Sequence, residues 1–169
     1  ELLVTRTHEV GLKVVLDFVP NHVARQYHSD TAPEGVDDLG AHDNKEMHFS
    51  PSNNFYYIPR QAFTPQFYIG EGEDRYFEYP AKATGNDCFG AFPGEYDWYE
   101  TVKLNYGVDY TGGGRCHFDP IPDTWYKMLD ILLFWCGKGV DAFRCDMAHM
   151  VPVEFWNWAI SKVKGNYPS

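Results

Sequence analysis

The chain has 169 residues, 44% of them hydrophobic and 22% charged, so it can build a core and lacks the composition that keeps a chain disordered. Its formal net charge of −10 argues against nucleic acid as a partner, because no basic stripe offsets the repulsion by phosphate. No apolar run approaches the roughly 18 residues of a membrane span, and the four cysteines lack the short paired spacing of a zinc ribbon and mildly favour a reducing compartment such as the cytoplasm.

Regular elements are predicted at both ends of the chain. Apolar residues with helical or strand-like spacing indicate five elements: a helix over 1–10, a strand over 12–19, a helix over 125–136, a strand over 140–145, and a helix with Pro152 as its first residue that runs to Gly165. Asp123 can cap the second helix. The strand over 140–145 is expected to be buried on both faces because nearly all its residues are apolar or easily buried.

The stretch 24–122 has a different composition, with more than half of the chain's aromatic residues and many Gly, Pro and Asn. It predicts a loop-rich subdomain with one or two antiparallel strand pairs around an aromatic core. A minority of its rings can line a sugar cleft, with six candidates: Tyr56, Tyr57, Phe89, Phe92, Trp98 and Tyr99. The acidic loop over 34–43 lacks the spacing of a calcium hand and is interpreted as a solvated loop.

Polar residues gather where the two predicted strands end. Asp17 and His22 close the first strand, and Arg144 and Asp146 lie two apart on the second, so the latter two share a face. An Arg beside a carboxylate keeps it ionised and limits its rotamers, which suits a nucleophile or a cation ligand. A purely structural ion pair accounts for these residues equally well.

Two motifs resemble a known family. Residues 17–22, Asp-Phe-Val-Pro-Asn-His, and residues 139–146, Gly-Val-Asp-Ala-Phe-Arg-Cys-Asp, resemble the first and second signature regions of the α-amylase family of glycoside hydrolases. The resemblance implies an α/β fold: a partial (β/α)8 TIM barrel with a loop-rich subdomain inserted between the third and fourth strands. Residues 1–23 and 123–169 would be barrel segments and 24–122 the inserted subdomain. A whole barrel needs about 250 residues, so the chain is expected to be a fragment that is inactive alone.

The resemblance also implies a chemistry, the retaining cleavage of an α-glucosidic bond in an α-glucan or maltooligosaccharide. Asp146 would be the nucleophile and Arg144 would hold it. Asp17 and His22 would bind sugar hydroxyls, and His149 would contact the sugar on the leaving-group side. The general acid, a Glu, is expected on the next barrel strand, beyond the last residue of the chain.

No cofactor is expected. Asn21 matches a calcium ligand of the family, which makes it a weak calcium candidate. The motif that commonly supplies an Asp to that site has Lys103 instead, and a cation beside Ca²⁺ is unfavourable.

Several functions stay open. The favoured one is an α-glucan hydrolase; an α-glucan transglycosylase of the same family differs from it only in how water reaches the covalent intermediate. A non-catalytic carbohydrate-binding or scaffold member of the family would keep the fold without turnover. An unrelated α/β protein could bind a divalent metal through Asp17, His22 and Asp146, although Arg144 opposes a cation there.

Overall fold

The computed structural model describes residues 2–28, 30–31, 33–67 and 76–168. The chain divides into two compact units: unit 1 comprises residues 1–21 and 125–169, and unit 2 comprises residues 22–124. These boundaries lie two residues from those of the expected barrel segments. The assignment of unit 1 to a barrel and of unit 2 to an insertion stays a prediction.

Unit 1 contains most of the helical structure. Its elements are α1 (Leu2–Glu9), β1 (Val15–Phe18), α2 (Asp123–Gly137, whose first two residues belong to unit 2), β8 (Ala142–Cys145), the 3₁₀ turn η2 (Ala148–Met150) and α3 (Val153–Asn166). All five predicted elements are confirmed, with ends that differ by at most three residues. Pro152 occupies the N-cap of α3 and not its first helical position.

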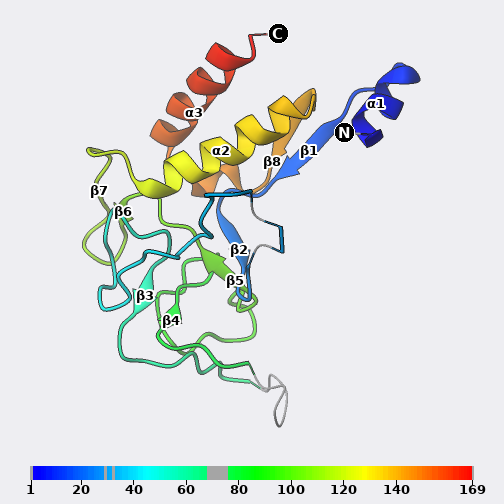
Figure 1. Cartoon of the computed structure of the whole chain (residues 1–169). Coiled ribbons are helices and arrows are strands. Elements are labelled where there is room, and N and C mark those ends of the chain that lie inside the picture. The colour runs from blue at the N-terminus through cyan, green and yellow to red at the C-terminus, as the bar shows by residue number, and fades with distance from the viewer. Residues whose placement is uncertain (1, 29, 32, 68–75, 169) are drawn as a thin grey trace. The chain divides into compact units, whose positions relative to one another are not determined.

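The strands β1 and β8 pair in parallel, with Val15 opposite Ala142 and Phe18 opposite Cys145 (Figure 1). The expectation that the second strand is buried on both faces is wrong, since Ala142 and Arg144 in β8 are exposed. The side chains of β8 alternate between two faces: Phe143 and Cys145 lie on a half-buried face, while Ala142 and Arg144 lie on the exposed one. A two-stranded parallel sheet neither establishes nor excludes a complete barrel, which stays a prediction.

Aromatic side chains form the core of unit 1. The ring of Phe18 packs edge-on against Phe143 and Trp156, with centroids 6.2 and 6.4 Å apart. Trp125 of α2 contacts the fully buried Phe155 of α3 at 5.6 Å. These contacts hold β1 against α3 and fasten α2 to α3, which fixes the strand ends that follow.

Asp141 anchors the start of β8. Its carboxylate accepts hydrogen bonds from Lys13 Nζ and from the Val14 backbone N–H, and it lies against His8 Nε2, each at 2.8 Å. The hydrogen bond from Lys13, followed by those from Val14 and His8, lowers the pKa of Asp141. The carboxylate thus joins the segment after α1 to the residue that precedes β8.

The described residues of unit 2 form three short antiparallel pairs where one or two were expected. They are β2 (His22–Ala24) with β5 (Thr101–Lys103), β3 (Tyr57–Ile58) with β4 (Ala81–Lys82), and β6 (Val108–Asp109) with β7 (Arg115–Cys116). A hydrophobic cluster is built from Ile58, Phe63, Ala81 and Ala91. Such short strands bury little apolar surface, so side-chain hydrogen bonds must contribute to holding the loops.

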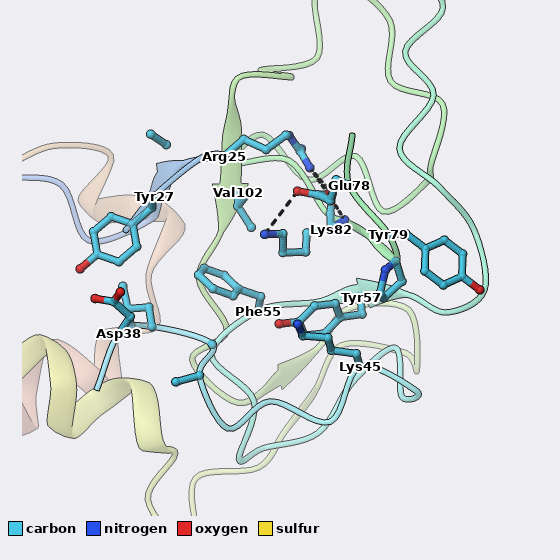
Figure 2. A pocket seen from close by; sticks show the side chains of 15 residues that line it. Arg25, Tyr27, Asp38, Lys45, Phe55, Tyr57, Glu78, Tyr79, Lys82 and Val102 are labelled. Carbon is cyan, nitrogen blue, oxygen red and sulfur yellow. Dashed lines mark hydrogen bonds and ion pairs between the residues drawn. The ribbon is translucent and has the colours of Figure 1, made fainter. Parts of the chain in front are cut away.

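A buried ion network supplies many of those bonds. The Arg25 guanidinium, in a residue 6% exposed, donates to Glu78 Oε1 at 2.7 Å and to the backbone carbonyls of Tyr99, Thr101 and Lys82. Figure 2 shows the Glu78 carboxylate between the side chains of Arg25 and Lys82. Desolvation lowers the pKa of Arg25, against the charge of Glu78, which raises it. The network ties the residue after β2 to β4, β5 and the loop that carries Glu78.

The last residue of the acidic loop over 34–43, Asp43, forms structural hydrogen bonds. The carboxylate of Asp43 accepts hydrogen bonds from the backbone N–H groups of Asn54 and Phe55, at 2.7 and 3.0 Å, and from the Tyr57 hydroxyl at 3.1 Å. Burial, with the nearby charge of Asp43, raises the pKa of Tyr57. Asp43 therefore serves as a structural acceptor, whereas Asp37 and His42 form an exposed pair as expected of a solvated loop.

The four cysteines are free thiols, and Cys136 and Cys145 are half-buried. In the residues that the structure describes, every helix is too short or too polar to cross a bilayer.

Glu78→Gln should destabilise the protein strongly. The change leaves the Arg25 guanidinium buried without a counter-charge, so the free energy of unfolding should fall by about 3 kcal/mol or more. Urea denaturation followed by fluorescence measures this change. Asp37→Asn is the control, because it removes one partner of an exposed pair and should change stability by less than about 0.5 kcal/mol. Equal effects of the two substitutions would contradict the role of the network.

Asp141→Asn should lower stability at neutral pH and lose its effect in acid. Because the pKa of Asp141 is lowered in the folded state, its contribution is complete above the unfolded value of about 4 and disappears as the pH falls further. Thermal melting of both proteins from pH 7 to pH 2.5 measures the difference. A difference that stays constant over this range would show that the carboxylate charge is not responsible.

Candidate functional site

The ends of β1 and β8 bring three charged side chains together. Asp17 and Arg144 stand opposite each other in the parallel register. Arg144 Nη1 lies 3.0 Å from Asp17 Oδ1 and 2.7 Å from Asp146 Oδ1, so one guanidinium bridges two carboxylates. The predicted shared face of Arg144 and Asp146 is confirmed by this ion pair.

The backbone sets the position of Asp146. Its N–H donates to the Phe18 carbonyl at 2.8 Å, which extends the parallel ladder one residue beyond β8. Met147, immediately after it, has a φ of 49°, a left-handed conformation that ends the strand sharply. Asp146 is thus the last residue held by strand pairing, at the carboxyl end of the sheet, where α/β folds place their ligands.

The triad is accessible and carries a net negative charge. The side chains of Arg144 and Asp17 are 61% and 57% exposed, while Asp146 is 29% exposed. The hydrogen bond that Arg144 donates to Asp17 and the charges of Asp17 and Asp146 raise the pKa of Arg144, which stays protonated. Two carboxylates against one guanidinium leave one unbalanced negative charge that can stabilise a developing positive charge on a ligand.

His22 belongs to unit 2, so the predicted sugar-binding residues are divided between the units. It begins β2, opposite Lys103 in β5, and its ring meets the ring of Trp98 edge-on, with centroids 5.4 Å apart. His149 lies in η2 of unit 1, three residues after Asp146, and is exposed. Asn21, the calcium candidate, is 1% exposed at the end of the segment that follows β1.

The candidate sugar-binding rings separate by burial. Tyr56 and Tyr57 are 1% and 3% exposed: the Tyr56 hydroxyl donates to the buried Val108 carbonyl, which makes Tyr56 a core ring, whereas Tyr57 donates to Asp43 and lines a cavity of unit 2. Phe89 and Tyr99 are half-buried. Phe92 and Trp98 are exposed, and of these two Trp98 contacts His22.

The residues matched to the family's calcium site do not fit a cation. Lys103 is 1% exposed, and its ammonium lies 2.6 Å from Asp87 Oδ1. Desolvation lowers the pKa of Lys103, and the hydrogen bond to Asp87 opposes this shift. Among the described residues, no group of three His, Cys, Asp or Glu side chains is arranged to hold a metal ion.

A cavity of about 220 Å³ lies in unit 2 beside the Arg25 network (Figure 2). Its buried polar groups already bond one another: Glu78 accepts from Arg25 and lies 3.3 Å from Lys82 Nζ, and the Tyr57 hydroxyl donates to Asp43. The cavity is thus an opening beside a structural ion network.

Sequence reasoning missed two contacts of the candidate residues. It assigned Asp17 to sugar hydroxyls or, in the alternative, to a metal, whereas the structure pairs it with Arg144. One signal could have revealed this pair. The two residues lie near the carboxyl ends of strands that were expected to be parallel, and such ends lie at the same edge of a sheet. The ion pair of Lys103 with Asp87 had no such signal, because Asp87 lies in a loop.

Comparison with known proteins finds partial relatives. No family model matches the chain. An α-1,4-glucan:maltose-1-phosphate maltosyltransferase of Cereibacter sphaeroides is 44% identical over 82 residues, which cover 45% of this chain and 14% of the relative. Enzymes of the same name match at 44% over 46 residues in Rhodospirillum rubrum (27% of this chain, 7% of the relative) and at 40% over 48 residues in Pseudomonas aeruginosa (28% and 7%).

Each match thus spans a small part of the relative's length. Maltosyltransferases of this kind are members of the α-amylase family, so the matches support the resemblance at the level of that family. They support a relation to glycosyl-transferring enzymes and to α-glucans more closely than to hydrolases. The chain is similar, over partial stretches, to α-glucan-active transferases of the α-amylase family.

Proposed function

We propose that this chain is part of a retaining, α-glucan-active enzyme that transfers glycosyl groups, with Asp146 as its nucleophile. The observation that carries the proposal is the bridge from Arg144 to Asp17 and Asp146 at the ends of two paired parallel strands. The named relatives, which are maltosyltransferases, support transfer over the hydrolysis that the signature regions alone favour.

The geometry suits a carboxylate nucleophile. The hydrogen bond from Arg144 holds one oxygen of Asp146 and leaves the other for attack on the anomeric carbon. The bond from that carbon to the leaving oxygen breaks as the glycosyl–Asp146 bond forms. A second carboxyl, about 5–5.5 Å from Asp146, must first protonate the leaving oxygen and then deprotonate the acceptor. The resemblance predicts this Glu on the next barrel strand.

The net negative charge of the triad assists the same step. The transition state of glycosyl transfer resembles an oxocarbenium ion, so positive charge develops beside Asp17 and Asp146. Arg144 keeps both carboxylates in place without neutralising them fully. In this proposal Asp17 and His22 bind hydroxyls of the reacting ring and His149 contacts the sugar on the leaving-group side.

The substrate test uses the complete protein with maltose 1-phosphate as donor and a maltooligosaccharide as acceptor. Transfer should release inorganic phosphate and lengthen the acceptor by two glucose units, in equal amounts, as phosphate assay and mass spectrometry can measure. Shortening of maltooligosaccharides by water, without products longer than the starting sugar, would instead assign hydrolysis to the same nucleophile. No change in either sugar would contradict the proposed function.

Asp146→Asn in the complete protein should lower kcat by about a thousandfold or more, because an amide cannot form the glycosyl intermediate. The nearly equal volume of Asn should leave the melting temperature close to that of the unsubstituted protein. Arg144→Lys should also impair turnover severely, since Lys keeps the charge but loses the rigid planar guanidinium whose Nη1 contacts both carboxylates. A purely structural pair predicts the reverse: kept activity per folded molecule and reduced stability.

Mass mapping after reaction with a fluorinated glycosyl donor gives a direct check, and a label on any residue except Asp146 would contradict the assignment.

Chelation should leave the melting temperature of the complete protein nearly unchanged. A calcium ion beside the Lys103 ammonium is repelled, so no binding free energy is lost when EDTA removes free Ca²⁺. Differential scanning calorimetry with EDTA, and again with excess Ca²⁺, measures the effect. A fall of many degrees that Ca²⁺ reverses would show that oxygens other than those of the family motif build a calcium site.

A further inference from the structure

The backbone makes an unusual turn directly after Asp146. Met147 has φ of 49° and ψ of 34°, a left-handed conformation that is sterically unfavourable for a residue with a long side chain. Its carbonyl accepts the Met150 N–H at 3.0 Å, which starts the 3₁₀ turn η2. A backbone conformation of this kind persists only where the surrounding structure enforces it, and it occurs often beside reacting groups.

The side chain of Trp156 in α3 supplies such a constraint. Its indole N–H donates to the Ala148 carbonyl at 3.0 Å. The same carbonyl accepts the Val151 N–H at 3.3 Å, so both the turn itself and a helix outside it hold Ala148. Because Ala148 follows Met147 directly, the bond from Trp156 fixes the chain two residues beyond Asp146.

The ring of Trp156 connects this bond to the strand that holds Asp146. The ring packs edge-on against Phe18, with centroids 6.4 Å apart, and against the fully buried Phe155 at 5.3 Å. The carbonyl of Phe18 also accepts the Asp146 N–H at 2.8 Å. Phe18 thus fixes Asp146 directly, through its carbonyl, and Ala148 indirectly, through the ring of Trp156.

We propose that Trp156 is a positioning residue for the nucleophile, because its indole N–H keeps Met147 left-handed and so holds the Asp146 carboxylate against Arg144. This inference rests on the proposed function. The strand ladder holds Asp146 on its N-terminal side, and the bond from Trp156 holds it on the other side. A carboxylate nucleophile has to lie in line with the anomeric carbon, and a displacement of about 1 Å can slow such a step about a hundredfold.

The test removes the indole N–H and keeps an aromatic ring at the same position. In the complete protein, Trp156→Phe should lower kcat for glycosyl transfer about tenfold or more and change KM for the donor less than about threefold, because the loss falls on the reacting carboxylate. The rate at which a fluorinated glycosyl donor labels Asp146 should fall by a similar factor, as mass spectrometry of the labelled peptide measures.

The matched control is Trp158→Phe, the same change two residues further along α3. The ring of Trp158 packs against Trp125 and Tyr126 of α2, with centroids 5.6 and 5.5 Å apart, and not against η2. This substitution should change kcat and the labelling rate less than about twofold. Circular dichroism of each variant gives the fraction that is folded at the assay temperature.

Substitutions at Met147 test whether Trp156 acts through the backbone. Met147→Val should lower kcat about as much as Trp156→Phe, since a β-branched residue resists the left-handed conformation. Adding Met147→Gly to Trp156→Phe should restore part of the lost kcat, since Gly adopts this conformation without steric cost.

The outcomes separate this inference from the proposed function. A merely structural Trp156 would lower the melting temperature in Trp156→Phe and leave kcat per folded molecule and the labelling rate unchanged, which would overturn the positioning role. A rise in KM at constant kcat, or a Met147→Gly change that restores nothing, would overturn it too. In these cases the unsubstituted protein still transfers glycosyl groups, so the proposed function stands. An unsubstituted protein that transfers none, to water or to a sugar, would overturn both.

Discussion

The parallel pairing of β1 with β8 is the constraint on which the candidate site depends. Because the register sets Asp17 opposite Arg144 and one further ladder bond fixes Asp146, three charged groups from segments far apart in sequence meet at one strand end. A shift of one residue would turn Arg144 to the face of the sheet opposite Asp17 and break the ion pair between the two strands. The aromatic packing of Phe18 against Phe143 and Trp156 resists such a shift. The residues that build the core therefore also fix the positions of the charged side chains of the candidate site.

Unit 2 is stabilised in a different way. Its strands have two or three residues each, and its loops are joined by buried charges: Arg25 with Glu78, and Lys103 with Asp87. Buried ions lose their hydration, so they are tolerated only where several hydrogen bonds compensate them, as the four acceptors around Arg25 do. Ion networks of this kind fix the geometry of the loops they join, which suits a unit built mostly of loops.

The sequence could predict what depends on local pattern. Helical and strand spacing located α2 and β8, and strand alternation placed Arg144 and Asp146 on one face. It could not predict contacts that depend on register or on loops. The pairing of Asp17 with Arg144 spans 127 residues, and Glu78 reaches Arg25 from a segment without periodicity. The burial of individual aromatic rings could not be predicted either. Tyr56 and Trp98 are equivalent candidates in the sequence, and only the fold shows that Tyr56 lies in a core while Trp98 is exposed.

The long separation of β1 from β8 also bears on how the protein is made. At a synthesis rate of about 5–20 residues per second, β1 emerges roughly 6 to 25 s before its partner strand exists. During that interval the backbone N–H and C=O groups of β1 are unpaired, so β1 can form hydrogen bonds with a strand other than β8. Closing so long a loop has an entropic cost of roughly 4 kcal/mol. If unit 2 folds before β8 is synthesised, the connection between the two strands is already ordered. Most of that entropy has then been lost in the folding of unit 2, and pairing β1 with β8 adds little to it. Since that cost rises by only about 0.6 kcal/mol when a loop doubles in length, evolution could enlarge unit 2 with little penalty to the strand pair beneath the site.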